Sequence, residues 1–227
     1  MKLQDNIASE FDEFSKNYTS DMQGCVPHYD SLLGCFAEGY PIETDATNIL
    51  DFGCGNGNVT EQLLKAFPKA NYHLLDASNE MLVICKKRFH KNIIQLIKSY
   101  FQEYAFPNDF FEIIAAGFSL HHCTTAEKAT LFEQCYKALK SGGILAISDL
   151  MIQKSSAAHS KLIAEWGALV NRNFPDGEKW KWIMEHYDEY DKPDSLEQHL
   201  EGLKAAGFID FNIVIKDQYW VHLKAKK

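Results

Sequence analysis

Short apolar runs alternate with segments of helical period along most of this chain. The apolar run at 49–52 is followed by a segment at 59–67 whose apolar residues repeat at helical spacing until Pro68. A second apolar run follows at 71–76. This alternation predicts an α/β fold, and 227 residues with 46% hydrophobic content suffice for one sizeable core.

A glycine-rich loop follows the first apolar run. Gly53, Gly55 and Gly57 occupy every second position there, directly after Asp51. Glycines between a strand and a helix leave backbone amides open to a nucleotide-like ligand at the carboxyl edge of a sheet. The dinucleotide fingerprint would need a third glycine or alanine at Asn58, so the spacing argues against NAD.

Asp76 ends the second apolar run, where a carboxylate can accept hydrogen bonds from both hydroxyls of a ribose. Loop and acid together predict a cofactor half-site. In the alternative interpretation, the loop only turns a strand into a helix and Asp76 caps the next helix.

These residues resemble motifs of the class I S-adenosylmethionine-dependent methyltransferases. The likeness continues beyond D-F-G-C-G-N-G and Asp76 to the segments at 106–107, 111–114, 118–122, 139–145 and 203–208. It implies a Rossmann-like, seven-stranded sheet, mostly parallel with a C-terminal antiparallel hairpin and helices on both faces. It also implies S-adenosylmethionine as cofactor and methyl transfer to a small-molecule nitrogen, oxygen or sulfur.

The resemblance assigns cofactor contacts to the glycine loop, the strand ends and the amino-terminal segment. The positions are Asp51, Gly53, Cys54, Gly55, Gly57, Asp76, Ala77, Met81, Tyr100, Phe101, Gly117, Tyr29 and Tyr18. The acid that usually receives the adenine amino group is replaced here by Tyr100, or by Ser99 if the gap is set differently. Tyr100 and Phe101 then either sandwich the purine or pack in the core.

The first thirty residues resemble a narrower group, the carboxy-S-adenosylmethionine synthases. Counting back from 206–208 puts Gly202 where that family carries a carboxylate-binding arginine. The missing cation favours ordinary methyl transfer, with Arg172 as a possible substitute. Two alternatives stay open: synthesis of the carboxylated cofactor from prephenate, and a non-catalytic S-adenosylmethionine-binding module that supports a partner protein.

The chain divides into one domain with four parts. These are a helical lid at 1–45, a cofactor-binding core at 46–152, a helical substrate cover at 153–193, and a terminal helix and hairpin at 194–227. The cover carries Trp166, Arg172 and Tyr187 as candidate substrate contacts. Aromatic enrichment of this kind is equally typical of helix packing or of a homodimer interface.

His121 and His122 follow the fourth predicted strand and are the candidate general bases, because imidazole titrates near neutrality. Alternatively, one caps the following helix while the other packs on the cofactor. No metal site is expected, because the side chains of adjacent residues should diverge and no ligand spacing supports them.

Charge and cysteine content narrow the kinds of partner and the cellular location that are expected for this protein. A net charge of -8 argues against nucleic-acid and anionic-membrane partners, which need clustered Lys and Arg. The six cysteines form no C-x-x-C pair, so free thiols and a cytoplasmic location are expected, with no membrane-spanning segment.

Overall fold

The computed structural model describes residues 17–40, 46–90 and 94–227 of the chain. The parts of the expected lid at 1–16 and 41–45 lie outside the described residues. No helix in the described ranges is long and apolar enough to cross a membrane.

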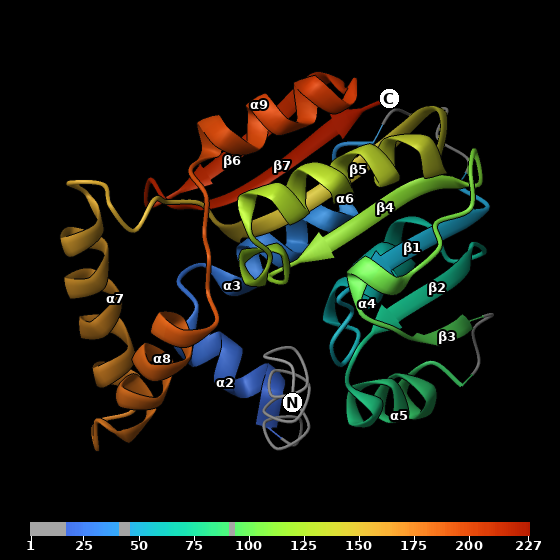
Figure 1. The fold of residues 1–227 in the computed structure, drawn as a ribbon. Helices are drawn as coiled ribbons and strands as arrows, with labels where there is room; N and C mark the ends of the chain where they lie inside the picture. The colour runs from blue at the N-terminus through green and yellow to red at the C-terminus, as the bar shows by residue number, and fades with distance from the viewer. Residues whose placement is uncertain (1–16, 41–45, 91–93) are drawn as a thin grey trace.

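A seven-stranded sheet in the order β3-β2-β1-β4-β5-β7-β6 forms the centre of the fold (Figure 1). Its strands are β1 (Asn48–Phe52), β2 (Asn71–Asp76), β3 (Ile94–Lys98), β4 (Phe111–Gly117), β5 (Leu139–Leu150), β6 (Ile209–Lys216) and β7 (Trp220–Lys226). The pairings among β1 to β5 are all parallel, whereas β7 runs antiparallel to both β5 and β6. The predicted sheet, including its terminal hairpin, is confirmed.

Helices cover both faces of this sheet. They are α2 (Tyr18–Cys25), α3 (Tyr29–Gly34), α4 (Asn58–Ala66), α5 (Asn79–Arg88), α6 (Thr125–Ala138), α7 (His159–Asn173), α8 (Glu178–Glu189) and α9 (Leu196–Ala206), with 3-10 turns η2 (Cys35–Ala37), η3 (Phe101–Glu103) and η4 (Leu120–His122). Buried residues of α3, α4 and α5 pack on one face, and those of α6 and α9 pack on the other (Figure 1). The helix predicted at 59–67 is α4, shifted by one residue at each end.

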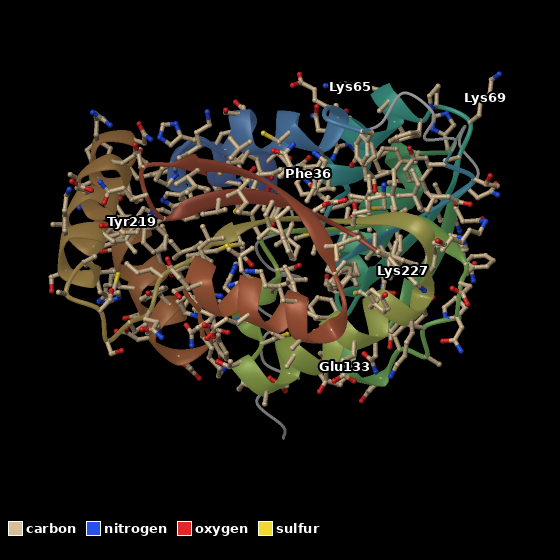
Figure 2. The ribbon with its side chains drawn as sticks, turned by 90° about the horizontal axis from the view of Figure 1, so that it is seen from above. Phe36, Lys65, Lys69, Glu133, Tyr219 and Lys227 are labelled. Carbon is tan, nitrogen blue, oxygen red and sulfur yellow. The ribbon has the colours of Figure 1, made fainter. Side chains whose placement is uncertain are left out.

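The central strands β1 and β4 are mostly apolar because both faces of the sheet are covered there. Ile49 and Leu50 are fully buried and contact opposite cores. Figure 2 shows Phe36 between the helices and the sheet, whereas Lys65 and Glu133 project into solvent. The interior is thus mainly apolar, and exposed charged residues such as Lys65 and Glu133 lie on the outer faces of the helices.

From β1 the chain adds β2 and β3 toward one edge of the sheet, and it then returns to place β4 and β5 on the other side of β1. The strand order therefore reverses between the neighbours β1 and β4. In open α/β sheets a ligand binds beyond the carboxyl ends of the strands at such a switch point. Helices α2, α7 and α8 lie together beyond that edge (Figure 1).

The described part of the expected lid divides into two. Tyr18 and Met22 of α2 line cavities at the switch point. In contrast, Leu32 and Phe36 are fully buried in the core, so α3 and η2 form part of the domain body instead of a cover across its mouth.

Candidate functional site

The glycine loop is tied to the end of β2 by backbone hydrogen bonds. The amides of Gly53 and Cys54 donate to the carbonyl of Leu75 at 2.8 and 3.1 Å. One carboxylate oxygen of Asp76 accepts from the Gly55 amide at 2.8 Å, and the other accepts from the Ser78 amide at 2.8 Å. Loop and acid therefore form one rigid unit at the carboxyl ends of β1 and β2.

A cavity lies against this unit, and we call it the glycine-loop cavity. Its lining comes from the ends of β1, β2, β3 and β4 and from α2: Tyr18, Gly53, Gly55, Asp76, Ala77, Ser78, Met81, Ser99, Tyr100, Phe101, Gln102, Phe118, Ser119, His122 and Cys123. Most of the predicted cofactor contacts are thus brought together. Tyr100 and Phe101 line the cavity, as the sandwich interpretation expects.

Asp51 and Cys54 are buried behind the loop and do not line this cavity. Asp51 accepts hydrogen bonds from the hydroxyl and amide of Thr60 at 2.6 and 3.1 Å, which fixes α4 to β1. Burial raises the pKa of Asp51 to about 7, although the two bonds from Thr60 oppose the shift. Asp51 thus supports the loop from behind and Cys54 is a buried residue of the loop itself, and direct cofactor contact by either stays a prediction.

Gly57, Gly117 and Tyr29 also lie outside the cavity lining. A Cβ at Gly57 would lie 2.3 Å from the ring of Phe89, and one at Gly117 would lie 2.4 Å from Val59. Both glycines therefore permit close helix packing. The hydroxyl of Tyr29 accepts a hydrogen bond from the side-chain Nδ2 of Asn58 at 2.9 Å, and the buried ring of Tyr29 packs on Phe118. Tyr29 therefore supports the cavity wall from behind.

A second cavity adjoins the first, and we call it the aromatic cavity. It is lined by Tyr18, Met22, Cys25, Val26, Phe118, His121, His122, Leu150, Trp166, Trp182, Ile183, His186, Asp191 and Trp220. Tyr18, Phe118 and His122 line both cavities, so a molecule in one lies next to a molecule in the other.

Phe118 stands at this boundary with a backbone φ of 55°, in the left-handed region that side chains rarely adopt. Its amide donates to the carbonyl of Ser148 at 2.7 Å, which holds the strained turn after β4 against β5. Strain of this kind, of order 1–3 kcal/mol, is typical of ligand sites.

Histidines and carboxylates form a buried cluster at the boundary. Nδ1 of His121 lies 2.5 Å from Asp149, which also accepts the His121 amide at 3.0 Å. Nδ1 of His122 lies 3.0 Å from Oδ1 of Asp191. The rings of His121 and His122 have centroids 4.2 Å apart, so the expectation that adjacent side chains diverge is wrong. The 3-10 turn η4 brings both rings to the same side.

The two candidate bases differ in charge. Burial alone lowers the pKa of His121, but Asp149 and Asp191 outweigh it and raise that pKa to about 9. Burial and the neighbouring His121 lower the pKa of His122 to about 4. His121 is therefore a proton-bearing imidazolium at neutral pH, and His122 is a neutral imidazole. His122, which lines both cavities, is the better placed of the two predicted bases.

Of the three predicted substrate residues, one lines the aromatic cavity and two do not. Trp166 lines the aromatic cavity and donates to the carbonyl of Cys25 at 2.6 Å. Tyr187 is buried behind it, with ring centroids 5.7 Å apart, and Arg172 is exposed on α7; neither lines the described cavities. Substrate contact by Tyr187 or Arg172 therefore has no support from the cavity lining and stays a prediction.

Gly202 packs against Phe132 between α9 and α6, where a Cβ would lie 3.1 Å from the ring. It lines neither cavity, so an arginine at that position would face α6 in this chain. Its absence there does not decide between methyl transfer and synthesis of the carboxylated cofactor.

Sequence reasoning did not find Phe118, Asp149, Asp191 or Trp220 as site residues. Asp149 near the end of β5 carried a usable signal, because the carboxyl ends of neighbouring parallel strands meet at one edge. Asp191 follows α8 in an irregular segment, and no spacing in the sequence pointed to it.

Comparison with known proteins agrees with this geometry. Residues 49–143 match the family model of a methyltransferase domain. The chain is 26% identical over 220 residues to the carboxy-S-adenosyl-L-methionine synthase of Shewanella sediminis, with 92% of this chain and 89% of that protein covered.

Two solved structures show the same fold. A SAM-dependent methyltransferase of Leishmania major has a TM-score of 0.69 at 16% identity, covering 98% of this chain and 82% of that one. Human N-acetylserotonin methyltransferase, solved in complex with SAM, has a TM-score of 0.64 at 16% identity, covering 97% of this chain and 56% of that one. The chain therefore contains a methyltransferase domain over residues 49–143 and has the fold of S-adenosylmethionine-dependent methyltransferases.

The methyltransferase domain match at 49–143 includes the glycine loop, Asp76, the turn after β4 and the two histidines. It stops before Asp149 and before α7 and α8, which supply much of the aromatic cavity. Apart from Tyr18, the lining of the glycine-loop cavity thus lies within the shared domain. Half of the residues that line the aromatic cavity come from positions 150–220, after that domain.

Proposed function

We propose that this methyltransferase transfers the methyl group of S-adenosylmethionine to a small-molecule nucleophile bound in the aromatic cavity. The observation that carries the proposal is the shared wall of Tyr18, Phe118 and His122 between the two cavities. The ribose of the cofactor would bind Asp76 and its adenine would lie by Tyr100 and Phe101. Its sulfonium then points toward the shared wall.

The reaction is an in-line displacement at the methyl carbon. The acceptor atom forms a bond to the methyl as the carbon–sulfur bond breaks, and the sulfonium charge is lost. The electrophile is already activated, so alignment supplies much of the rate, up to roughly 7–11 kcal/mol of the barrier in well-oriented systems. His122, neutral at the boundary, would receive a proton from an acceptor that carries one.

The aromatic lining supports an apolar or aromatic acceptor. Trp166, Trp182 and Trp220 line the cavity, and the rings of Trp166 and Trp220 are 5.6 Å apart at 80°. Flat side chains of this size bind apolar groups through contact area. The cavity lies within one chain, so a small molecule fits the arrangement without a partner subunit, and the homodimer, the absence of nucleic-acid partners and the cytoplasmic location stay predictions.

The test of the reaction uses S-adenosylmethionine carrying an isotopically labelled methyl group, together with a fraction of small metabolites. We expect the label to appear by mass spectrometry in a molecule of that fraction, with S-adenosylhomocysteine as the other product. Cofactor binding without any labelled product would support the alternative of a non-catalytic binding module.

A second candidate function is synthesis of carboxy-S-adenosylmethionine, which the likeness to the Shewanella sediminis synthase favours. A buried substrate carboxylate needs a cationic partner. Neither cavity has a lysine or arginine among its described lining residues, and the cationic His121 of the aromatic cavity already faces Asp149 and Asp191. We therefore expect incubation with prephenate and S-adenosylmethionine to yield no carboxylated cofactor. A cofactor heavier by one carboxylate, copurified or made in the assay, would overturn the methyl-transfer proposal.

Asp76→Ala should weaken binding of S-adenosylhomocysteine about ten- to a hundredfold. The variant loses two ribose hydrogen bonds to a charged group, worth roughly 2–3 kcal/mol together. Isothermal titration calorimetry measures the dissociation constant. The control is Glu133→Ala, which removes an exposed carboxylate of α6 that does not line the cavity. Equal affinity in the Asp76 and Glu133 variants would remove Asp76 from the cofactor site.

A further inference from the structure

The histidine–carboxylate cluster contains more ligating groups than a single proton acceptor requires. Oδ1 of Asp191 lies 3.0 Å from Nδ1 of His122, 3.5 Å from Nε2 of His186 and 3.8 Å from Nε2 of His121. The same oxygen is buried and has no hydrogen bond of ordinary geometry among the described residues. A buried carboxylate oxygen in that state is costly unless a cation satisfies it.

We propose that His121, His122 and Asp191 form a binding site for a divalent transition-metal ion, with His186 beside it. One ligand atom from each of the three residues lies within 4.8 Å of the others. Around a tetrahedral ion with bonds of about 2.0–2.2 Å, ligand atoms are about 3.4 Å apart. The separations of 3.0 and 3.8 Å around Asp191 bracket that value, and the two imidazole nitrogens lie within 4.8 Å of each other, so side-chain shifts of about 1 Å would complete the site.

The orientation of His121 supports a ligand role. Asp149 accepts the hydrogen of Nδ1 and is itself held by the amides of His121 and Leu150 at 3.0 and 2.9 Å. This contact fixes the ring and leaves Nε2 directed toward Asp191. A carboxylate behind a histidine in this way is the usual outer partner of a metal-bound imidazole.

The ligand set also indicates the kind of ion. Two imidazoles and one carboxylate suit Zn²⁺ or Fe²⁺, whereas Ca²⁺ and Mg²⁺ prefer oxygen ligands. Three protein ligands leave coordination positions open, and all three residues line the aromatic cavity. With the ion bound, His122 would be a ligand instead of the proton acceptor. An acceptor hydroxyl or thiol would then lose its proton to solvent more readily, because a bound cation lowers the pKa of such a group.

Metal binding is measured on untagged protein that has been stripped with a chelator and dialysed, without cofactor or acceptor. We expect isothermal titration calorimetry to show one equivalent of Zn²⁺ bound with micromolar affinity or tighter, an order-of-magnitude expectation. Co²⁺ serves as a spectroscopic probe and should give a visible ligand-field band that excess Zn²⁺ removes. This result is independent of methyl transfer, so the two proposals fail separately.

Variants locate the ion. Asp191→Asn and His122→Gln keep the side-chain size and should each weaken Zn²⁺ binding by at least about tenfold, and Asp149→Asn should weaken it about ten- to a hundredfold through His121. His90→Ala, exposed after α5, is the control and should bind as the unmodified protein does. Circular dichroism checks that each variant is folded. Absence of stoichiometric Zn²⁺ binding, or equal binding in folded Asp191→Asn and His122→Gln, would overturn the proposal.

Discussion

Replacing Lys128 with Met is expected to lower the free energy of unfolding by about 3–5 kcal/mol, the range for breaking a buried ion pair from one side. Nζ of Lys128, with its side chain 2% exposed, lies 2.9 Å from Asp194 and donates to the carbonyl of Lys192 at 2.6 Å. The substitution leaves the carboxylate of Asp194 buried without its cation. Urea unfolding followed by circular dichroism measures the loss.

The double variant Lys128→Met/Asp194→Asn provides the control for this expectation. The second substitution removes the negative charge of Asp194, which Lys128→Met leaves buried without a cation. The double variant should therefore be more stable than Lys128→Met alone. A cost below about 1 kcal/mol for the single variant would show that the pair is effectively solvated. Lys128 also fixes the segment that carries Asp191. The carbonyl of the next residue, Lys192, accepts from Nζ of Lys128 at 2.6 Å, and the amide of Lys192 donates to the carbonyl of His121 at 2.6 Å.

Gly57→Ala is the second large effect, with an expected loss of about 2–6 kcal/mol in the free energy of unfolding. Its backbone has φ +89°, and an added Cβ would lie 2.3 Å from Cε2 and 2.8 Å from Cζ of Phe89. Left-handed strain contributes roughly 1–3 kcal/mol. Overpacking against a ring held in the core contributes about 1–3 kcal/mol more.

Gly177→Ala separates these two terms. Gly177 has φ +78° and nothing within 4 Å of an added Cβ, so only the backbone strain should be lost there. Combining Phe89→Leu with Gly57→Ala removes the ring that the new Cβ meets, so part of the stability lost to overpacking should be recovered. Equal losses for Gly57→Ala and Gly177→Ala would contradict the packing role assigned to Gly57.

The fold was largely predictable because its signals are local. The apolar run at 49–52 needs only neighbouring residues to specify a strand, and the helical spacing at 59–67 specifies α4 within one residue at each end. Asp76 was recognised for the same reason, since the acid lies at the end of a strand and beside the loop in sequence. It lines the cavity as expected.

Residues of the loop itself show where local reasoning ends. A glycine can serve a ligand or a neighbouring helix, and the sequence pattern is the same in both cases. Gly53 and Gly55 line the cavity, whereas Gly57 accommodates Phe89. The packing of α5 against the loop decides between the two, and that packing depends on residues about thirty positions away.

The sequence by itself determined the α/β alternation and the glycine loop with Asp76, because periodicity and motif spacing act over a few residues. The parallel sheet and the class of cofactor followed from the resemblance of these motifs to a known family. Only the tertiary structure decided which side chains meet at the acceptor side. His121 and His122 are adjacent in sequence, but their partners Asp149 and Asp191 come from β5 and from the segment after α8. Contacts between segments so far apart follow from how α2, α7 and α8 pack beyond the sheet, which no local pattern encodes.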